Sequence, residues 1–265
     1  MGNHTAVRGF LVSVSLLVLV TSASLAEDVT DRKTIAKVDE FFTEKAKVKE
    51  ATLKNFDKTI DRWKSNRALT PGARQDKAEQ WKRARDHFDS TEQFLEEEQF
   101  TGIEFDYHVK ISRCYAPVAT LFHQRMEDAL KADDHKLVDD IQVEKLRTER
   151  RLLGPMEFTG PSAWCGTFDR PGGTIPYCLF ISDIKKGGSF AGHVEDNIGI
   201  PGNWAYDLEG HVDGRVFEYT MTKSVRGGFQ KLVAVGVVSG NRVMIRVTQK
   251  IGGSTHTGFA ILKKG

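Results

Sequence analysis

Hydrophobic and polar positions follow two different periods along this chain, and the change falls past its middle. From Asp31 to Leu153, apolar residues recur every three or four positions among Lys, Glu, Asp and Arg, which predicts amphipathic helices. From Trp164 to Lys264, apolar and polar residues alternate in short runs separated by turn residues, which predicts strands. The pattern therefore predicts an α+β chain, with an antiparallel helical bundle or stalk followed by an antiparallel β-domain.

Capping residues mark where the later helices are expected to begin. Thr70 is placed to cap a second helix, because a threonine side chain accepts a hydrogen bond from the free N–H groups of the first turn. Thr101 and Glu104 form the capping-box pattern at the start of a third helix. Asp133 or Asp134 is expected to cap a fourth. Connections this short make successive helices antiparallel neighbours.

The C-terminal part is predicted to contain eight strands in sequence order. Glycine recurs inside several of them, and a glycine inside a strand is typical of a tight bend where a barrel closes. Eight sequential antiparallel strands with such bends are best closed as an up-and-down barrel, which removes the sheet edges. The expected strands are Trp164–Asp169, Tyr177–Ile184, Ser189–Glu195, Trp204–Val212, Arg215–Lys223, Lys231–Val238, Arg242–Lys250 and Thr255–Lys263.

The alternation also predicts which side chains point into the barrel. The bulky members of the last strand, Phe259 and Ile261, are assigned inward, which turns Gly258 outward. So many large inward residues favour a filled interior, and convergent polar groups in an apolar cavity, the usual mark of a ligand site, are not evident. If the open end is hollow, Trp204, Tyr206 and Tyr219 are the residues expected to contact a small apolar ligand. The full inward set is Trp164, Phe168, Tyr177, Leu179, Ile181, Phe190, Val194, Tyr206, Leu208, Phe217, Tyr219, Met221, Leu232, Val238, Val243, Ile245, Val247, Phe259 and Ile261.

One part of the outer surface is predicted to be apolar. Val233, Val235 and Val237 make the sixth strand apolar on both faces, and Phe180 and Met244 extend the patch. A contiguous apolar patch on a barrel exterior is expected to be covered by another element. The helices of this chain and a second subunit or protein partner both remain candidates.

The N-terminus predicts export. Arg8 precedes the apolar run Phe10 to Val20, and Ser24-Leu25-Ala26 places small residues at the cleavage subsites, as in a secretory signal peptide cleaved between Ala26 and Glu27. The alternative is an uncleaved membrane anchor, which is disfavoured because the apolar run is shorter than the ~18 residues of a spanning helix. The mature protein is therefore expected to be secreted, periplasmic or envelope-associated, without a transmembrane segment.

Three cysteines permit one disulfide in an exported chain. Cys165 and Cys178 fall on the first two predicted strands. If they face each other, Trp164 lies opposite Leu179 and both point to the other face of the sheet, so the cysteine and hydrophobic pairings agree. A Cys165–Cys178 disulfide is favoured over two free thiols, and Cys114 is expected to be a small helical hydrophobe.

Composition and motifs exclude several functions. A formal net charge of +2 lacks the excess of Lys and Arg typical of nucleic-acid binding. Nucleophile elbows, phosphate loops, Cys-x-x-Cys pairs and zinc-protease motifs are absent. No catalytic residue, metal ligand or cofactor site is predicted. His193 and His211 with nearby glutamates admit a zinc site, but a solvated outer face explains them as well.

The strand motifs resemble those of a known family. Trp164-x-Gly166-x-Phe168 in the first strand, the Gly-x-Val of the third and fourth, and Gly236-x-Val238-x-Gly240 are similar to the avidin and streptavidin family, and more loosely to calycin barrels. The resemblance covers Trp164 to Lys264 and implies an eight-stranded barrel with a ligand mouth at one end. It does not extend to biotin binding, because that family's tryptophan walls fall near Lys223 and Val247.

These patterns predict four segments: a signal peptide (1–26), a helical bundle or stalk (27–153), a linker (154–163) and a β-barrel (164–265). The leading functional hypothesis is an exported, non-enzymatic interaction or envelope-associated protein whose helical stalk presents the barrel. The alternative is a barrel that binds a small apolar ligand, and a hydrolase is the third.

Overall fold

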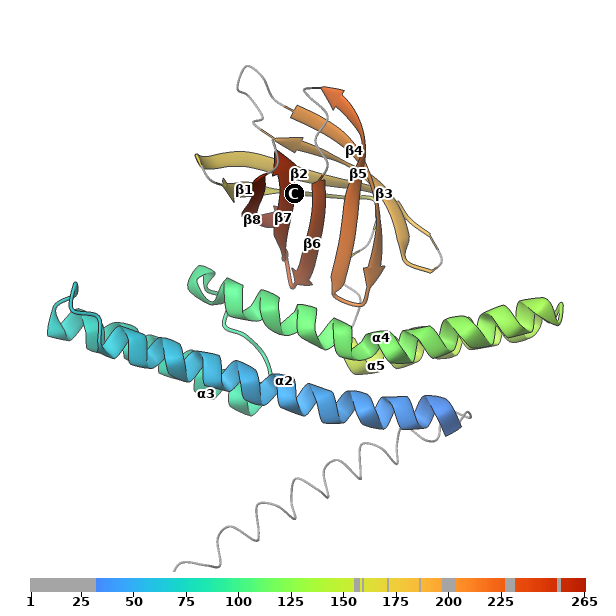
Figure 1. The fold of residues 1–265 in the computed structure, drawn as a ribbon, viewed down its shortest axis with the longest axis horizontal. Helices are drawn as coiled ribbons and strands as arrows, with labels where there is room; N and C mark the ends of the chain where they lie inside the picture. The colour runs from blue at the N-terminus through green and yellow to red at the C-terminus, as the bar shows by residue number, and fades with distance from the viewer. Residues whose placement is uncertain are drawn as a thin grey trace, which may run out of the picture. The chain divides into compact units, whose positions relative to one another are not determined.

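The computed structural model describes residues 32–154, 158, 160–170, 172–185, 187–196, 204–226, 232–251 and 254–265. The predicted signal peptide lies outside the described residues, as do residues 155–157 and 159 of the predicted linker. Within the described ranges, four long helices precede eight strands (Figure 1). The predicted α+β order is therefore confirmed.

The chain divides into two compact units, and the division falls inside a helix. Of the described residues, the helical unit comprises those up to Glu92 and Arg113–Leu152, and the barrel unit comprises Gln93–Ser112 and those from Leu153 onward. The helix α4 (Thr101–Lys131) thus contributes its first turns to the barrel unit and the remainder to the helical unit.

Two helices of the helical unit pair through aromatic side chains. Phe56 of α2 (Arg32–Lys64) packs its ring against Trp81 of α3 (Pro71–Thr91), with the ring centroids 6.0 Å apart. The predicted cap of α3 is confirmed, because the Thr70 side chain accepts a hydrogen bond from the Ala73 N–H at 3.3 Å. The Asp134 carboxylate likewise accepts from the N–H of Leu137 in α5, at 3.0 Å. The helices of this unit, besides the end of α4, are α2 (Arg32–Lys64), α3 (Pro71–Thr91) and α5 (His135–Leu153).

The barrel closes as the alternation predicted. Each strand is antiparallel to the next in sequence, and the last strand pairs with the first. This order is an up-and-down barrel without a free edge. The strands are β1 (Ser162–Arg170), β2 (Gly173–Ile184), β3 (Ser189–Asp196), β4 (Trp204–Asp213), β5 (Val216–Arg226), β6 (Leu232–Ser239), β7 (Arg242–Ile251) and β8 (Ser254–Lys264).

The first two strands are joined by a disulfide. Cys165 of β1 lies directly opposite Cys178 of β2 and is bonded to it. In the same register Trp164 is opposite Leu179, and both are buried in the barrel interior. The agreement between the cysteine pairing and the hydrophobic pairing thus predicted both the bond and the register.

The predicted inward residues of seven strands line the barrel core, but the assignment for β8 was wrong by one residue. Ala260 and Leu262 lie in the core, and Phe259 packs on the outside against Phe105 of α4, with ring centroids 5.5 Å apart. The bulkier residues, Phe259 and Ile261, were assigned inward because an outer face is normally polar. Here part of the outer face is covered, so size does not identify the inner one.

Interior glycines make room for aromatic rings on neighbouring strands. A Cβ atom at Gly236 would overlap the ring of Phe217, which lies opposite it on β5. A Cβ atom at Gly258 would likewise overlap the ring of Phe168. Close packing in the barrel interior therefore accounts for glycine at these two strand positions.

The start of α4 differs from the capping box expected there. A short 3-10 helix, η1 (Glu98–Phe100), runs directly into α4 at Thr101. Among the described residues the Thr101 hydroxyl has no hydrogen-bond partner, and the Glu104 carboxylate instead forms a buried ion pair with Arg242 of β7. The capping-box prediction was wrong because a long-range cation competes for this carboxylate.

Candidate ligand-binding cavity at the barrel mouth

The two ends of the barrel differ in how they are filled. We call the end where β1, β3, β5 and β7 finish the mouth, and the opposite end the base. At the base, Phe158 is fully buried, and its ring stacks on Phe217 with centroids 4.5 Å apart. Its ring also lies 6.3 Å from that of Trp164 and 5.6 Å from that of Phe190. The base is therefore filled by aromatic side chains, as the predicted core required.

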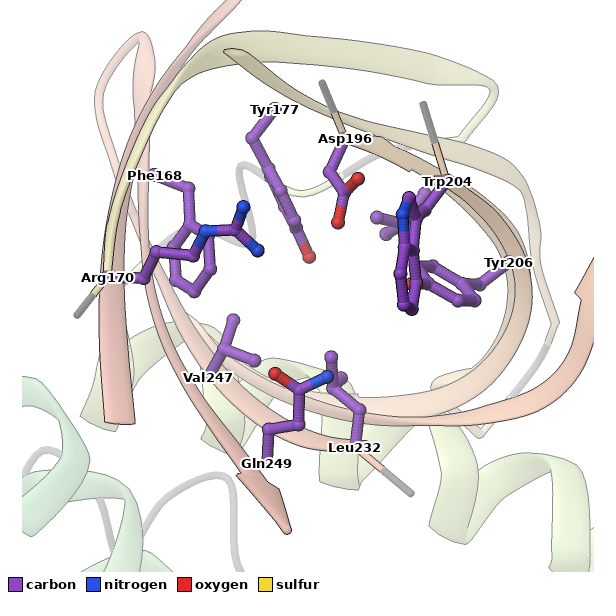
Figure 2. A pocket seen from close by; sticks show the side chains of 10 residues that line it. Phe168, Arg170, Tyr177, Asp196, Trp204, Tyr206, Leu232, Val247 and Gln249 are labelled. Carbon is purple, nitrogen blue, oxygen red and sulfur yellow. The ribbon is translucent and has the colours of Figure 1, made fainter. Parts of the chain in front are cut away.

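A cavity of about 110 Å³ lies at the mouth (Figure 2). Side chains alternate between the two faces of each strand, so every second residue points into the barrel. At the mouth, inward residues near the ends of β1, β3 and β7 lie beside inward residues near the starts of β2, β4 and β6. The lining side chains are Phe168, Arg170, Tyr177, Val194, Asp196, Trp204, Tyr206, Leu232, Val247 and Gln249.

Aromatic rings form much of the wall and the floor. Trp204 and Tyr206 stand side by side, with ring centroids 6.1 Å apart and planes at 55°. Phe168 lies 5.3 Å from the ring of Tyr177. The Tyr177 hydroxyl shares a hydrogen bond of 2.7 Å with the hydroxyl of Tyr219, and both tyrosines are buried. Flat apolar walls with hydroxyl groups at one point favour a planar guest.

Three polar side chains converge on the same space. Figure 2 shows the guanidinium of Arg170, the carboxylate of Asp196 and the amide of Gln249 pointing into the cavity from three sides. The prediction that convergent polar groups are missing was therefore wrong. Each follows an inward apolar residue of its strand by two positions, after Phe168, Val194 and Val247. The signal was present, but Arg170 and Asp196 lie one residue beyond the strand ends expected from the sequence.

Burial raises the pKa of one carboxyl and three tyrosine hydroxyls around the cavity. Burial raises the pKa of the Asp196 carboxyl, while the backbone N–H of Trp204 and the charge of Arg170 act to lower it. Burial also raises the pKa values of Tyr177, Tyr206 and Tyr219. The tyrosines therefore keep their protons at neutral pH and can donate hydrogen bonds. The Asp196 Oδ1 atom has no hydrogen-bond partner among the described residues.

The structure brings together two of the three residues predicted to contact a ligand. Trp204 and Tyr206 line the cavity directly. Tyr219 lies one hydrogen bond away, through the hydroxyl of Tyr177. The sequence did not single out Arg170 or Asp196, which supply charge at the mouth.

The residues of the predicted outer patch lie in different surroundings. Val237 and Met244 are fully buried in a cluster with Phe105 of α4, and Val235 packs partly against it. The Arg246 guanidinium lies 4.5 Å from the centre of the Phe105 ring and pairs with Asp106 at 2.9 Å. The first turns of α4, which belong to the barrel unit, thus contact this face.

Two patch residues lie outside that cluster. Val233 is 43% exposed. Phe180 is half-buried and lies near His193 instead, with ring centroids 6.3 Å apart. His193 itself is flanked by Asp207 at 3.3 Å and Glu195 at 3.5 Å.

Metal-ligating residues do not gather elsewhere in the described ranges. No group of three or more His, Cys, Asp or Glu side chains there has a geometry that could hold a metal ion. A search of the same residues finds no helix with the length and apolar character needed to cross a membrane.

The fold and the cavity define a small closed barrel with a ligand-sized hollow at one end. The described strands form a closed eight-stranded up-and-down meander, as the glycine-marked strands predicted. No protein-family model and no curated protein sequence matches the chain.

Solved structures resemble about two fifths of the chain. A structure of EF1p2_mFAP2b bound to DFHBI is 11% identical, with a TM-score of 0.35, over 40% of this chain and 93% of that one. A low-affinity mutant of shwanavidin is 18% identical, with a TM-score of 0.33, over 42% of this chain and 98% of that one. Apo shwanavidin is 19% identical over 41% of this chain and 97% of that one, with a TM-score of 0.33. These likenesses describe the fold alone.

Proposed function

We propose that the barrel unit binds one small planar organic molecule at its mouth. The observation that carries this proposal is the difference between the two ends. The base is filled by the stacked rings of Phe158 and Phe217, whereas the mouth holds a cavity with aromatic walls and convergent polar groups. An apolar hollow with a few inward-pointing polar groups is the usual character of a small-molecule site.

The size of the cavity limits the guest. Its volume is about 110 Å³, somewhat less than the ~150 Å³ of an apolar protein cavity that accepts benzene. A guest the size of one small ring is therefore about the largest that this volume can enclose without movement. Trp204 and Tyr206 are the side chains placed to contact its face.

Binding is tested with the full mature chain and a set of single-ring compounds, followed by saturation-transfer NMR. The decisive variant is Val247→Phe, because Val247 lines the cavity and is buried, so a larger side chain occupies the guest's space. The matched control is Val233→Phe, the same change on the outer surface of the neighbouring strand, where Val233 is 43% exposed. Compounds that bind the unaltered protein should bind the control equally and lose at least tenfold in affinity to Val247→Phe.

Two results would refute the proposal. One is a screen in which no ring compound binds the unaltered protein. The other is a Val247→Phe protein that is folded by circular dichroism and still binds as tightly as the control. If that variant does not fold, Leu232→Phe replaces it, because Leu232 is only partly buried at the same wall.

Export and an interaction role remain proposals for the rest of the chain. The Cys165–Cys178 disulfide supports export, since such bonds persist mainly in oxidising compartments. Intact mass measurement of the secreted protein should give a chain that begins at Glu27, and a retained leader would contradict cleavage there.

A protein partner or second copy is proposed for the part of the outer patch around Val233, and native mass spectrometry of Val233→Glu tests it by loss of assembly.

A further inference from the structure

The mouth carries two opposite charges that face one small space. The Arg170 guanidinium and the Asp196 carboxylate both line the cavity, and the charge of Arg170 acts on the carboxyl of Asp196. No other charged side chain is among those lining it in the part of the chain that the structure describes. An anionic guest would be attracted by Arg170 but repelled by Asp196, and a cationic guest the reverse, so neither ion gains from both charges. Because Asp196 is partly buried, the repulsion of an anion there is screened less than in water, whereas Arg170 is exposed and acts more weakly.

The hydrogen-bonding groups around the cavity are mixed in the same way. Arg170 only donates, an ionised Asp196 only accepts, and the Gln249 amide does both. The Tyr177 hydroxyl adds a group at the floor. A guest that places one acceptor and one donor side by side in its plane can satisfy both kinds of group. A purely apolar ring leaves them unpaired, which costs affinity.

We propose that the guest is a neutral planar molecule carrying a carboxamide-type edge, a carbonyl beside an N–H, on a single ring. This inference rests on the proposed function and narrows it to one chemical class. In it, the carbonyl accepts from Arg170 or Gln249 and the N–H donates to Asp196, while the ring lies against Trp204 and Tyr206.

Four single-ring probes separate the possibilities: benzamide is neutral and has both groups, benzoate is an anion, benzamidinium is a cation, and toluene is apolar and smaller. Dissociation constants are measured for each with the full chain at neutral pH. Benzamide is expected to bind at least tenfold more tightly than each of the other three. Asp196→Asn should strengthen benzoate binding at least tenfold, and Arg170→Gln should do the same for benzamidinium.

The control for the charge changes is Asp207→Asn, the same substitution on the outer face of β4, where Asp207 contacts His193. It should leave all four constants unchanged. Equal binding of benzamide and toluene, or of benzamide and either ion, overturns the inference while the proposed function stands. So does a failure of all four probes when other rings bind and Val247→Phe blocks them. Failure of every ring compound overturns the proposed function itself.

Discussion

Removal of the Phe158 ring, which fills the base of the barrel, should destabilise the barrel unit strongly. Phe158 is fully buried and contacts three other rings, those of Trp164, Phe190 and Phe217. Replacing a buried Phe by Ala costs about 3–5 kcal/mol, from lost burial and the cavity that remains. Each aromatic pair adds about 0.5–1.5 kcal/mol to simple burial. We therefore expect Phe158→Ala to lower the free energy of unfolding of the barrel unit by about 4 kcal/mol.

The assay must report on the barrel unit alone, because the chain also contains a helical unit. Hydrogen exchange followed by mass spectrometry does so through peptides from β5 and β6, whose amides pair across the barrel wall. A loss of about 4 kcal/mol corresponds to roughly 1,000-fold faster exchange of amides that open only on unfolding.

A change at a less buried ring provides the control. Phe180→Ala removes the same side chain from the outer face, where Phe180 is half-buried beside His193. It should cost less than about 1.5 kcal/mol, since solvent or neighbouring side chains can occupy the vacated space. The reasoning fails if Phe158→Ala accelerates exchange no more than Phe180→Ala does.

Three further changes test other parts of the barrel unit. Gly236→Ala should destabilise it by at least about 2 kcal/mol in urea denaturation, because the new Cβ overlaps the Phe217 ring; a neutral effect would contradict the packing role of this glycine. Glu104→Gln should cost about 3–5 kcal/mol by leaving the buried Arg242 charge unpaired, and leucine at both positions should recover most of it; a Glu104→Gln protein as stable as the parent would contradict this. His108→Gln should flatten the loss of stability on acidification from pH 6.5, measured by urea denaturation at each pH, and an unchanged slope would refute it.

The direction of this pH effect follows from the pKa of His108. Burial, with the positive charges of Arg215 and Arg242, lowers that pKa to about 3, against about 6.5 in an unfolded chain. The stability contribution of the neutral imidazole is thus complete above pH 6.5 and is lost as the pH falls toward 3, by up to ~1.4 kcal/mol per pH unit. Burial raises the pKa of Glu104, so that carboxyl acts in the opposite direction. Comparison of His108→Gln with the parent protein removes the contribution of Glu104.

Local patterns predicted the elements and most of the barrel register. Alternation identified eight strands, and the pairing of Cys165 with Cys178 placed Trp164 opposite Leu179. Both inferences need only the period of a strand and the fact that a slip by one residue reverses every side chain. They are therefore available without knowledge of the tertiary structure.

The same local reasoning gave wrong predictions at β8 and at the start of α4, because both lie at surfaces that another element covers. Phe259 and Ala260 could not be assigned from their sizes, because Phe259 packs against Phe105 on the outside. The partner of Glu104 is Arg242, 138 residues later in the chain. A capping box is a local motif, and no local pattern reveals that a distant cation will compete for the carboxylate.

Two partly or fully buried carboxylates, those of Glu104 and Asp196, differ in the groups that contact them. The difference bears on the function of the barrel mouth. The buried Glu104 carboxylate has Arg242 directly against it, although burial still raises its pKa. Asp196 is also desolvated, and its Oδ1 atom has no hydrogen-bond partner among the described residues. Folded proteins retain an incompletely satisfied polar group mainly where function requires it. Its place beside Trp204, in the same cavity as Arg170, is where a guest with an N–H group would complete the hydrogen bonding that the described residues leave open.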